Sequence, residues 1–278
     1  MNKISHIPFS VCMSVYKNDN ADDFLTAVHS VTDCQTIRPH ELILVIDGPI
    51  PDSLEHAIQA LSNELNNFII IRFEENKGHA AARQAGIDAA HYDIIAIMDS
   101  DDIALPDRFE KQLHFMVQNA DVDVVGGQIT EFIHDTDNIV GKREVPLTDA
   151  AIKRYMRSRC PMNLMTIMAH KESIMRAGGF INWFCEEDYY LWIRMMQANC
   201  TFANIDAILS NVRVGKKMYQ RRGGWKYFKS ERGIQQYMFK NNIISYARYL
   251  YNVAGRFIVQ VIMPNWLRGF VFQKLFRK

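Results

Sequence analysis

Residues 93–102 read DIIAIMDSDD, an apolar run that ends directly in three carboxylates. Apolar runs rich in β-branched residues are typical of strands that are covered on both faces of a sheet. Three similar runs come earlier, and helical patterns separate the four: the runs are 9–15, 41–46 and 68–73, and the helical patterns are 22–31, 53–65 and 78–90. This alternation predicts βαβ units around a mostly parallel sheet, and so an α/β fold.

Polar loops follow the four predicted strands, at 14–16, 47–48, 74–78 and 99–102, and three of them carry carboxylates. In open α/β sheets, ligands bind beyond the carboxyl ends of the strands. The sequence therefore predicts a ligand site at the edge of the sheet where these loops meet.

The acidic loop after the fourth strand is the strongest of these signals. Asp99, Asp101 and Asp102 repel one another unless a cation or strong hydrogen-bond donors compensate their charge. Carboxylates together with substrate phosphates are usual ligands of Mg²⁺, and Mn²⁺ suits the same oxygens. The alternative is a solvated acidic loop before a helix that begins at Asp107, but the position at the end of a strand favours the metal.

A second acidic cluster, Glu186-Glu187-Asp188, precedes an aromatic helical pattern over 189–194. A carboxylate beside aromatic residues is partly desolvated, which raises its pKa and suits it to act as a general base. The simpler alternative is that acids in a first helical turn offset the helix macrodipole.

A third pattern, Asn76-Lys77-Gly78 followed by Ala82-Arg83, fits a helix start that receives a phosphate, with Lys77 or Arg83 supplying charge. The chain contains neither the G-x-G-x-x-G fingerprint nor a P-loop. The usual sequence arguments for a dinucleotide-binding fold or a P-loop nucleotidase therefore do not apply.

Taken in order, these motifs resemble those of the family 2 glycosyltransferases, inverting enzymes with a GT-A fold. The resemblance covers residues 9–194 and rests on FSVCMSVYKN (9–18), ELILVIDG (41–48), NKG with ARQAG (76–86), DSDD with LPDRF (99–109) and ED with LW-x-R (187–194). The chain departs from the family pattern at two positions. Ile46-Asp47 stands where a pair of acids is common, and Gln84 replaces a common Asn.

The resemblance implies a role for each matched residue. The nucleotide-sugar site would comprise Ser14, Tyr16, Asp47, Lys77, Arg83, Asp99 and Ser100. Asp101 and Asp102 would hold Mg²⁺ or Mn²⁺. Asp188 would be the catalytic base, with Glu187 as the second candidate.

The C-terminal part of the chain has a different charge from the rest. Residues 213–278 contain 15 Lys and Arg and one acid, Glu231, so the whole chain has a net charge of only +1 because residues 1–212 are acidic. Basic residues interleaved with large aromatic residues suit an anionic membrane surface. Arg213, Arg221 and Arg222 could contact the diphosphate of a lipid or of the donor. Nucleic acid is not expected as a partner, and the alternative is a helical subdomain that packs on the body.

Two further features bound the interpretation. The apolar stretch between Arg256 and Arg268 holds 11 residues and is interrupted by Pro264. A transmembrane helix needs about 20 residues, so no span is expected. The five cysteines include no C-x-x-C pair, which disfavours a disulfide framework or a zinc site and favours a reducing compartment.

The resulting prediction has two parts: a GT-A domain over 1–212, with a Rossmann-like nucleotide-binding mixed sheet flanked by helices, and a basic helical extension over 213–278. The resemblance implies an inverting transfer of a hexose (glucose, galactose or an N-acetylhexosamine) from a UDP-sugar to a polyprenyl-diphosphate-linked glycan. Such an enzyme would act in O-antigen or capsule synthesis, as a peripheral protein at the cytoplasmic face of the inner membrane. The alternatives are a non-catalytic nucleotide-sugar-binding scaffold and a transferase that uses dTDP-rhamnose. A phosphatase with Asp99 as nucleophile fits less well, because Ile103 stands where its motif requires Thr.

Overall fold

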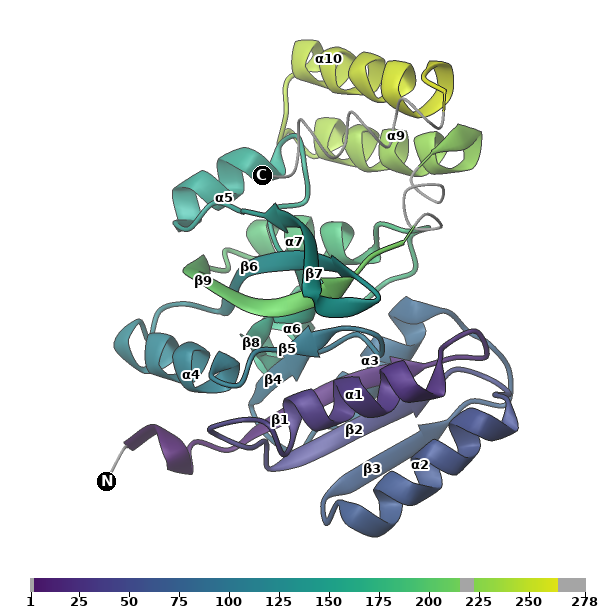
Figure 1. Cartoon of the computed structure of the whole chain (residues 1–278). Coiled ribbons are helices and arrows are strands. Elements are labelled where there is room, and N and C mark those ends of the chain that lie inside the picture. The colour runs from purple at the N-terminus through teal and green to yellow at the C-terminus, as the bar shows by residue number, and fades with distance from the viewer. Residues whose placement is uncertain (1–2, 216–222, 265–278) are drawn as a thin grey trace.

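The computed structural model describes residues 3–215 and 223–264, and shows one mixed β-sheet with helices on both faces (Figure 1). The four predicted strands form its parallel half, in the order β3–β2–β1–β4. Their bounds are Phe9–Val15 (β1), Glu41–Ile46 (β2), Phe68–Arg72 (β3) and Ile94–Ile97 (β4). The predicted βαβ units are therefore confirmed in this half.

Helices cover both faces of the parallel half, because side chains alternate between the two faces along each strand. Phe9, Val11 and Met13 of β1 pack in one core with α1, α2 and α4, whereas Cys12 packs in the opposite core with α3 and α7. The helices of the body are α1 (Ala21–Val31), α2 (Asp52–Glu64), α3 (His79–Ala89), α4 (Arg108–Gln118), α5 (Asp149–Met156), α6 (Lys171–Arg176) and α7 (Glu187–Gln197). Burial on both faces explains why the strand sequences are nearly all apolar.

The other half of the sheet is mixed, as the resemblance to GT-A enzymes implies, whereas the alternation of strands and helices alone indicated a mostly parallel sheet. Strand β8 lies antiparallel between β4 and β6, β9 lies parallel to β6, and β5 and β7 pair antiparallel with β9 and β6. Their bounds are Ile103–Ala104 (β5), Val124–Ile133 (β6), Asp135–Arg143 (β7), Met168–His170 (β8) and Phe202–Arg213 (β9).

Only the end of the apolar segment 163–170 forms a strand, which is β8. A 3-10 turn, Leu164–Thr166, comes before β8. Asn163 Nδ2 donates to Gly127 O at 2.8 Å, and Thr166 Oγ1 donates to Asn163 O at 2.7 Å. These side-chain hydrogen bonds give the backbone an alternative to the sheet ladder.

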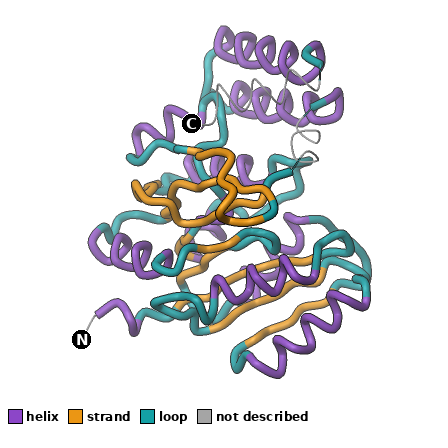
Figure 2. Tube along the Cα trace, viewed as in Figure 1, coloured by secondary structure: helices purple, strands orange, loops and turns teal. Residues whose placement is uncertain are grey.

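The described residues after 223 are helical, as predicted. Helices α9 (Gly224–Lys240) and α10 (Tyr246–Phe257) form a layer above α7 in Figure 1, and a π-helical turn, Ile258–Ile262, extends α10. Figure 2 shows the strands gathered in the body, with none in this layer. No helix among the described residues is long and apolar enough to cross a membrane. The proposed boundary after residue 212 falls at the end of β9 and remains a prediction.

Candidate active site

Asp47 joins the loops that follow β2 and β3. Its carboxylate accepts hydrogen bonds from the Lys77 backbone N–H (2.6 Å), the Gly78 backbone N–H (2.9 Å) and Asn76 Nδ2 (2.9 Å). Gly48 permits the close approach: its φ is +85°, and a Cβ there would lie 2.6 Å from the Asn76 nitrogen. Asp47 therefore acts on the site by shaping the loop that begins α3.

Arg83 links the two acidic motifs, although Asp99 and Glu187 lie 88 residues apart in the sequence. Its guanidinium donates to Asp99 Oδ1 at 2.9 Å and to Glu187 Oε1 at 2.6 Å. The Arg83 side chain is only 11% exposed and that of Glu187 14%. Burial disfavours the charged guanidinium, but the two carboxylates outweigh it and raise the pKa of Arg83. The structure thus brings the predicted donor and base motifs to one place.

Asp19 connects the loops that follow β1 and β4, and it is not among the site residues predicted from the sequence. Its Oδ2 accepts from the Tyr16 backbone N–H (3.1 Å) and from Ser100 Oγ (2.9 Å). Tyr16 in turn lies edge-on to the His79 ring, with 5.7 Å between centroids. Desolvation by burial raises the pKa of Asp19. Asp19 lies one position beyond the matched opening segment, 9–18, so only its place after the first strand could have indicated it.

The remaining predicted donor-site residues lie at the same edge. Ser14 is the second-last residue of β1, where it is half-buried. Lys77 lies over the Phe73 ring, with its Nζ 4.8 Å from the centroid.

Asp101 and Asp102 differ in exposure. Asp101 is exposed, and desolvation together with the charges of Asp99 and Asp19 raises its pKa to about 6. Asp102 is buried, and desolvation followed by repulsion from Asp101 and Asp99 raises its pKa well above the usual range. A hard divalent cation would relieve this repulsion and accept carboxylate oxygens as ligands, so these residues fit a metal site.

Arg213, the last residue of β9, was predicted to contact a diphosphate. In the structure it binds the acidic loop and pairs with an acid of α1. Its backbone N–H donates to Asp102 Oδ1 at 2.9 Å, and its guanidinium pairs with Asp23 at 2.9 Å. The same guanidinium donates to the Asp101 and His134 carbonyl oxygens. Arg213 therefore fixes the loop. Arg221 and Arg222 lie outside the described residues.

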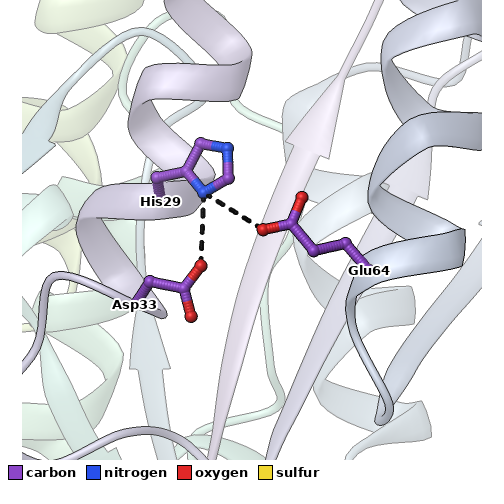
Figure 3. Close-up of side chains that lie close together, drawn as sticks. All are labelled: His29, Asp33 and Glu64. Carbon is purple, nitrogen blue, oxygen red and sulfur yellow. Dashed lines mark ion pairs between the residues drawn. The ribbon is translucent and has the colours of Figure 1, made fainter.

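Three side chains of the kinds that bind metal ions lie together away from this edge of the sheet. His29, Asp33 and Glu64 come together at the ends of α1 and α2 (Figure 3). Nδ1 of His29 lies 3.5 Å from Asp33 and 3.9 Å from Glu64. Both helices run back from the carboxyl edge of the strands, so this cluster lies toward the opposite edge. Asp33 also pairs with Arg38, and the cluster is an exposed set of ion pairs.

Asp188 stands in the first turn of α7. Its Oδ1 accepts from the Tyr189 backbone N–H at 2.7 Å, and the Cys160 thiol donates to Oδ2 at 3.7 Å. Burial and the neighbouring charge of Glu187 raise the pKa of Asp188. A carboxylate with a raised pKa is suited to accept a proton near neutral pH.

Glu186, the first acid of the cluster, is turned toward the C-terminal helices. It is 6% exposed, and its Oε1 accepts from Tyr227 Oη of α9 at 2.7 Å. Burial and the charges of Glu231 and Asp188 raise its pKa well above the usual range. No pattern in the sequence indicates this contact, because Tyr227 is one of many aromatic residues in the basic extension.

The mixed sheet, the acidic loop at its edge and the facing Glu187-Asp188 pair define a glycosyltransferase with a GT-A fold. The chain belongs to glycosyl transferase family 2, whose family model matches residues 10–184. Members of this class commonly use a divalent metal. The five cysteines form no disulfide with one another.

Similar proteins fall in the same class. A UDP-Gal:alpha-D-GlcNAc-diphosphoundecaprenol beta-1,3-galactosyltransferase of Escherichia coli is 32% identical over 272 residues, 97% of each chain. The amylovoran biosynthesis glycosyltransferase AmsE of Erwinia amylovora is 34% identical over 235 residues, 84% of this chain and 85% of its own. The crystal structure of S. aureus TarS 1–349 with UDP-GlcNAc matches 91% of this chain and 73% of its own, with a TM-score of 0.62 and 17% identity.

Proposed function

We propose that this glycosyltransferase moves a hexose from a UDP-sugar to a polyprenyl-diphosphate-linked glycan, with inversion at the anomeric carbon, during surface polysaccharide synthesis. The main support for the proposal is the pair of hydrogen bonds from Arg83 to Asp99 and Glu187, because they hold the donor loop beside the base motif. The names of the E. coli relative and of the TarS complex support the donor, and the E. coli name also supports the acceptor.

Different residues at the edge of the sheet would bind different parts of the donor. Ser14, Tyr16 and the loop shaped by Asp47 would hold the uracil and ribose. Lys77, Arg83, Asp99 and Ser100 would lie along the phosphates and the sugar. Mg²⁺ or Mn²⁺ held by Asp101 and Asp102 would neutralise the charge on UDP as it leaves.

Asp188 is the better of the two base candidates. Glu187 accepts a hydrogen bond from Arg83 at 2.6 Å, whereas among the described residues the Asp188 side chain accepts hydrogen bonds only from the Tyr189 backbone N–H and the Cys160 thiol. The acceptor hydroxyl holds its proton tightly at neutral pH, so a carboxylate must take that proton as the oxygen attacks. One base and a single displacement give inversion, whereas retention would need a second carboxylate as nucleophile.

A transfer assay separates this function from its alternatives. UDP-glucose, UDP-galactose, UDP-N-acetylhexosamines and dTDP-rhamnose are each supplied with a lipid-diphosphate-linked sugar, and nucleoside diphosphate release is measured. We expect acceptor-dependent release from one UDP-sugar. Release from dTDP-rhamnose alone would identify the alternative donor, and binding without release from any donor would identify a scaffold.

Removal of divalent metal is expected to lower turnover by at least about 100-fold, because a metal contributes several kcal/mol to stabilising the charge on the leaving group. The measurement is the transfer rate after exhaustive chelation and after readdition of Mg²⁺ or Mn²⁺. Asp101→Asn should raise the metal concentration that restores half of the rate. Full activity after chelation would contradict Asp101 and Asp102 as metal ligands.

The outward face of α10 supports the membrane part of the proposal. Leu250, Tyr251, Ile258 and Ile262 are 48–74% exposed, while Asn252 of the same helix is buried. This reverses the usual arrangement of a helix on a soluble domain. Because Glu231 is the only acid in 213–278 and pairs with Arg256, the layer presents net positive charge beside an apolar face. Such a face fits an anionic bilayer surface, which for this class of reaction would be the cytoplasmic face of the inner membrane.

The place of two further arginines in the sequence supports the same proposal. Arg221 and Arg222 stand in the sequence between Arg213, at the acidic loop, and the start of α9. They would contact the diphosphate of the donor or of the lipid-linked acceptor.

Ile258→Glu should weaken binding to vesicles of phosphatidylglycerol and phosphatidylethanolamine by at least about tenfold, since burying such a side chain contributes about 1.5–3 kcal/mol. Val117→Glu on α4 is the matched control, because Val117 is 53% exposed and Ile258 52%. Co-sedimentation measures both. Equal binding of the two variants to vesicles would contradict this face as the membrane contact. Wild-type protein that forms dimers and does not bind vesicles would contradict it too.

A further inference from the structure

A groove separate from the donor loops lies between the segment before Glu186 and the first turns of α9. It has a volume of about 350 Å³ and is lined by Trp183, Phe184, Lys226, Lys229 and Ser230. Both lysines are exposed, and Lys226 Nζ lies 4.0 Å from the centroid of the exposed Phe184 ring. The groove thus combines an apolar aromatic wall with two positive charges.

Hydrogen bonds fix the two walls of the groove to each other. Trp183 Nε1 donates to the Ser230 carbonyl at 3.2 Å, and Ser230 Oγ donates to the Phe184 carbonyl at 2.5 Å. The Trp183 ring also packs on Tyr190 of α7, with 4.6 Å between centroids. Gly233 lets α9 come this close, because a Cβ there would lie 2.9 Å from the Trp183 ring.

The same contacts hold the groove near the candidate base. Phe184 precedes Asp188 by four residues, so the two backbones lie within ~14 Å of each other. Tyr227, between the two lysines in the sequence, donates to Glu186 at 2.7 Å and so ties this part of α9 to the acidic cluster. A ligand in the groove would therefore lie within a few sugar lengths of Asp188.

The charge of the groove selects the kind of ligand. None of its described lining residues is acidic, and the nearest acid in the sequence of α9, Glu231, is paired with Arg256. Lysine ammonium groups are point charges that suit phosphate oxygens. An aromatic ring offers an apolar surface on which the C–H face of a sugar can lie.

We propose that this groove binds the sugar-diphosphate headgroup of the acceptor, with Lys226 and Lys229 against the diphosphate and Phe184 against the sugar. The inference rests on the proposed function and assigns the acceptor part of that site. The lipid-linked source is favoured over a free nucleotide because α10 packs directly on this end of α9. The Phe257 ring of α10 lies 6.0 Å from that of Trp225 and 5.4 Å from that of Phe228. A bilayer against α10 would therefore deliver a membrane-anchored diphosphate to the groove.

The test uses the full chain carrying Lys226→Ala and Lys229→Ala together. Two acceptors are compared: a sugar linked through a diphosphate to a short alkyl chain, and the same sugar as an alkyl glycoside without diphosphate. We expect the KM of the diphosphate acceptor to rise at least about tenfold, the loss typical of a hydrogen bond to a charged group. The KM of the UDP-sugar and the transfer to the plain glycoside should stay unchanged.

Two further variants check the specificity of the effect. Phe184→Ala should raise the KM of both acceptors, because both present the sugar. Lys240→Ala removes an exposed lysine at the far end of α9 and should change neither. An unchanged KM for the diphosphate acceptor in the double variant would overturn the assignment. An equal rise in the KM of the UDP-sugar would overturn it too, because the lysines would then serve the donor.

A binding measurement separates this inference from the proposed function. Calorimetric titration of the diphosphate acceptor into donor-free protein should give binding to the wild type that the double variant loses. Such binding would support the groove even if the transfer assay detected no sugar transfer. A lack of transfer would contradict only the proposed function. Absence of binding to the wild type would overturn the groove while leaving transfer to be judged by its own assay.

Discussion

Replacing Asp188 by asparagine is expected to lower kcat by about 10²- to 10⁴-fold, the usual contribution of proton transfer by a positioned group. Asparagine has nearly the same shape but cannot accept the proton of the attacking hydroxyl. The amide oxygen of the asparagine can still accept the hydrogen bond that the Tyr189 N–H donates to Asp188 Oδ1. The start of α7 should therefore keep its geometry. UDP binding, measured by calorimetry, should therefore survive.

The control for this variant is Asp206→Asn, which removes an exposed acid on β9 and should leave kcat unchanged. The pH profile gives an independent readout. Since burial and Glu187 raise the pKa of Asp188, wild-type activity should be lost as the pH falls through a value above that of an ordinary aspartate. The variant should lack this acid limb. Wild-type turnover in Asp188→Asn, or a larger loss in Glu187→Gln, would move the role away from Asp188.

Replacing Arg83 by methionine is expected to lower the free energy of unfolding by up to about 3–5 kcal/mol, the cost of breaking a buried ion pair, because Asp99 and Glu187 are only 28% and 14% exposed and would lose their partner. Methionine fills similar space, so the loss reports mainly the missing charge. Asp99 and Glu187 would repel each other or take up protons, and transfer activity should fall along with stability. Denaturant unfolding measures the first effect and the transfer assay the second.

Arg72→Met is the matched control, because Arg72 also makes two hydrogen bonds to one glutamate, Glu55, at 2.8 and 2.6 Å. That pair is exposed, with Arg72 at 49%, so its loss should cost no more than about 1 kcal/mol. Similar losses in both variants would show that the Arg83 pair is not a buried link between the two motifs.

The sequence was sufficient to predict the parallel half of the sheet because that half is buried on both faces. The run at 41–46, for example, forms a strand in which every residue is buried. Strand β7 escaped prediction because it is mostly exposed and polar, and β5 because it has only two residues. Such strands form because β6 and β9 offer them partners, which is information from tertiary structure and not from local pattern.

The site was predictable to the extent that its residues belong to short ordered motifs. Asp99 and Glu187 were both predicted, and the structure brings them together on Arg83. Asp19 and Tyr227 were not, because each acts through one contact with a residue that is distant in the sequence. The individual roles of the site residues remain predictions that the variants above test.

The hydrogen bond from Tyr227 to Glu186 couples two segments that are distant in the sequence, which constrains how this enzyme can be engineered. A chimera that imports acceptor preference from a relative would have to exchange 183–188 and 224–240 as one cassette, since either piece alone would meet a mismatched counterpart. With the proposed roles of the groove and of Asp188, acceptor recognition and base placement would be inherited together, and a change of acceptor during divergence would carry the risk of displacing the base.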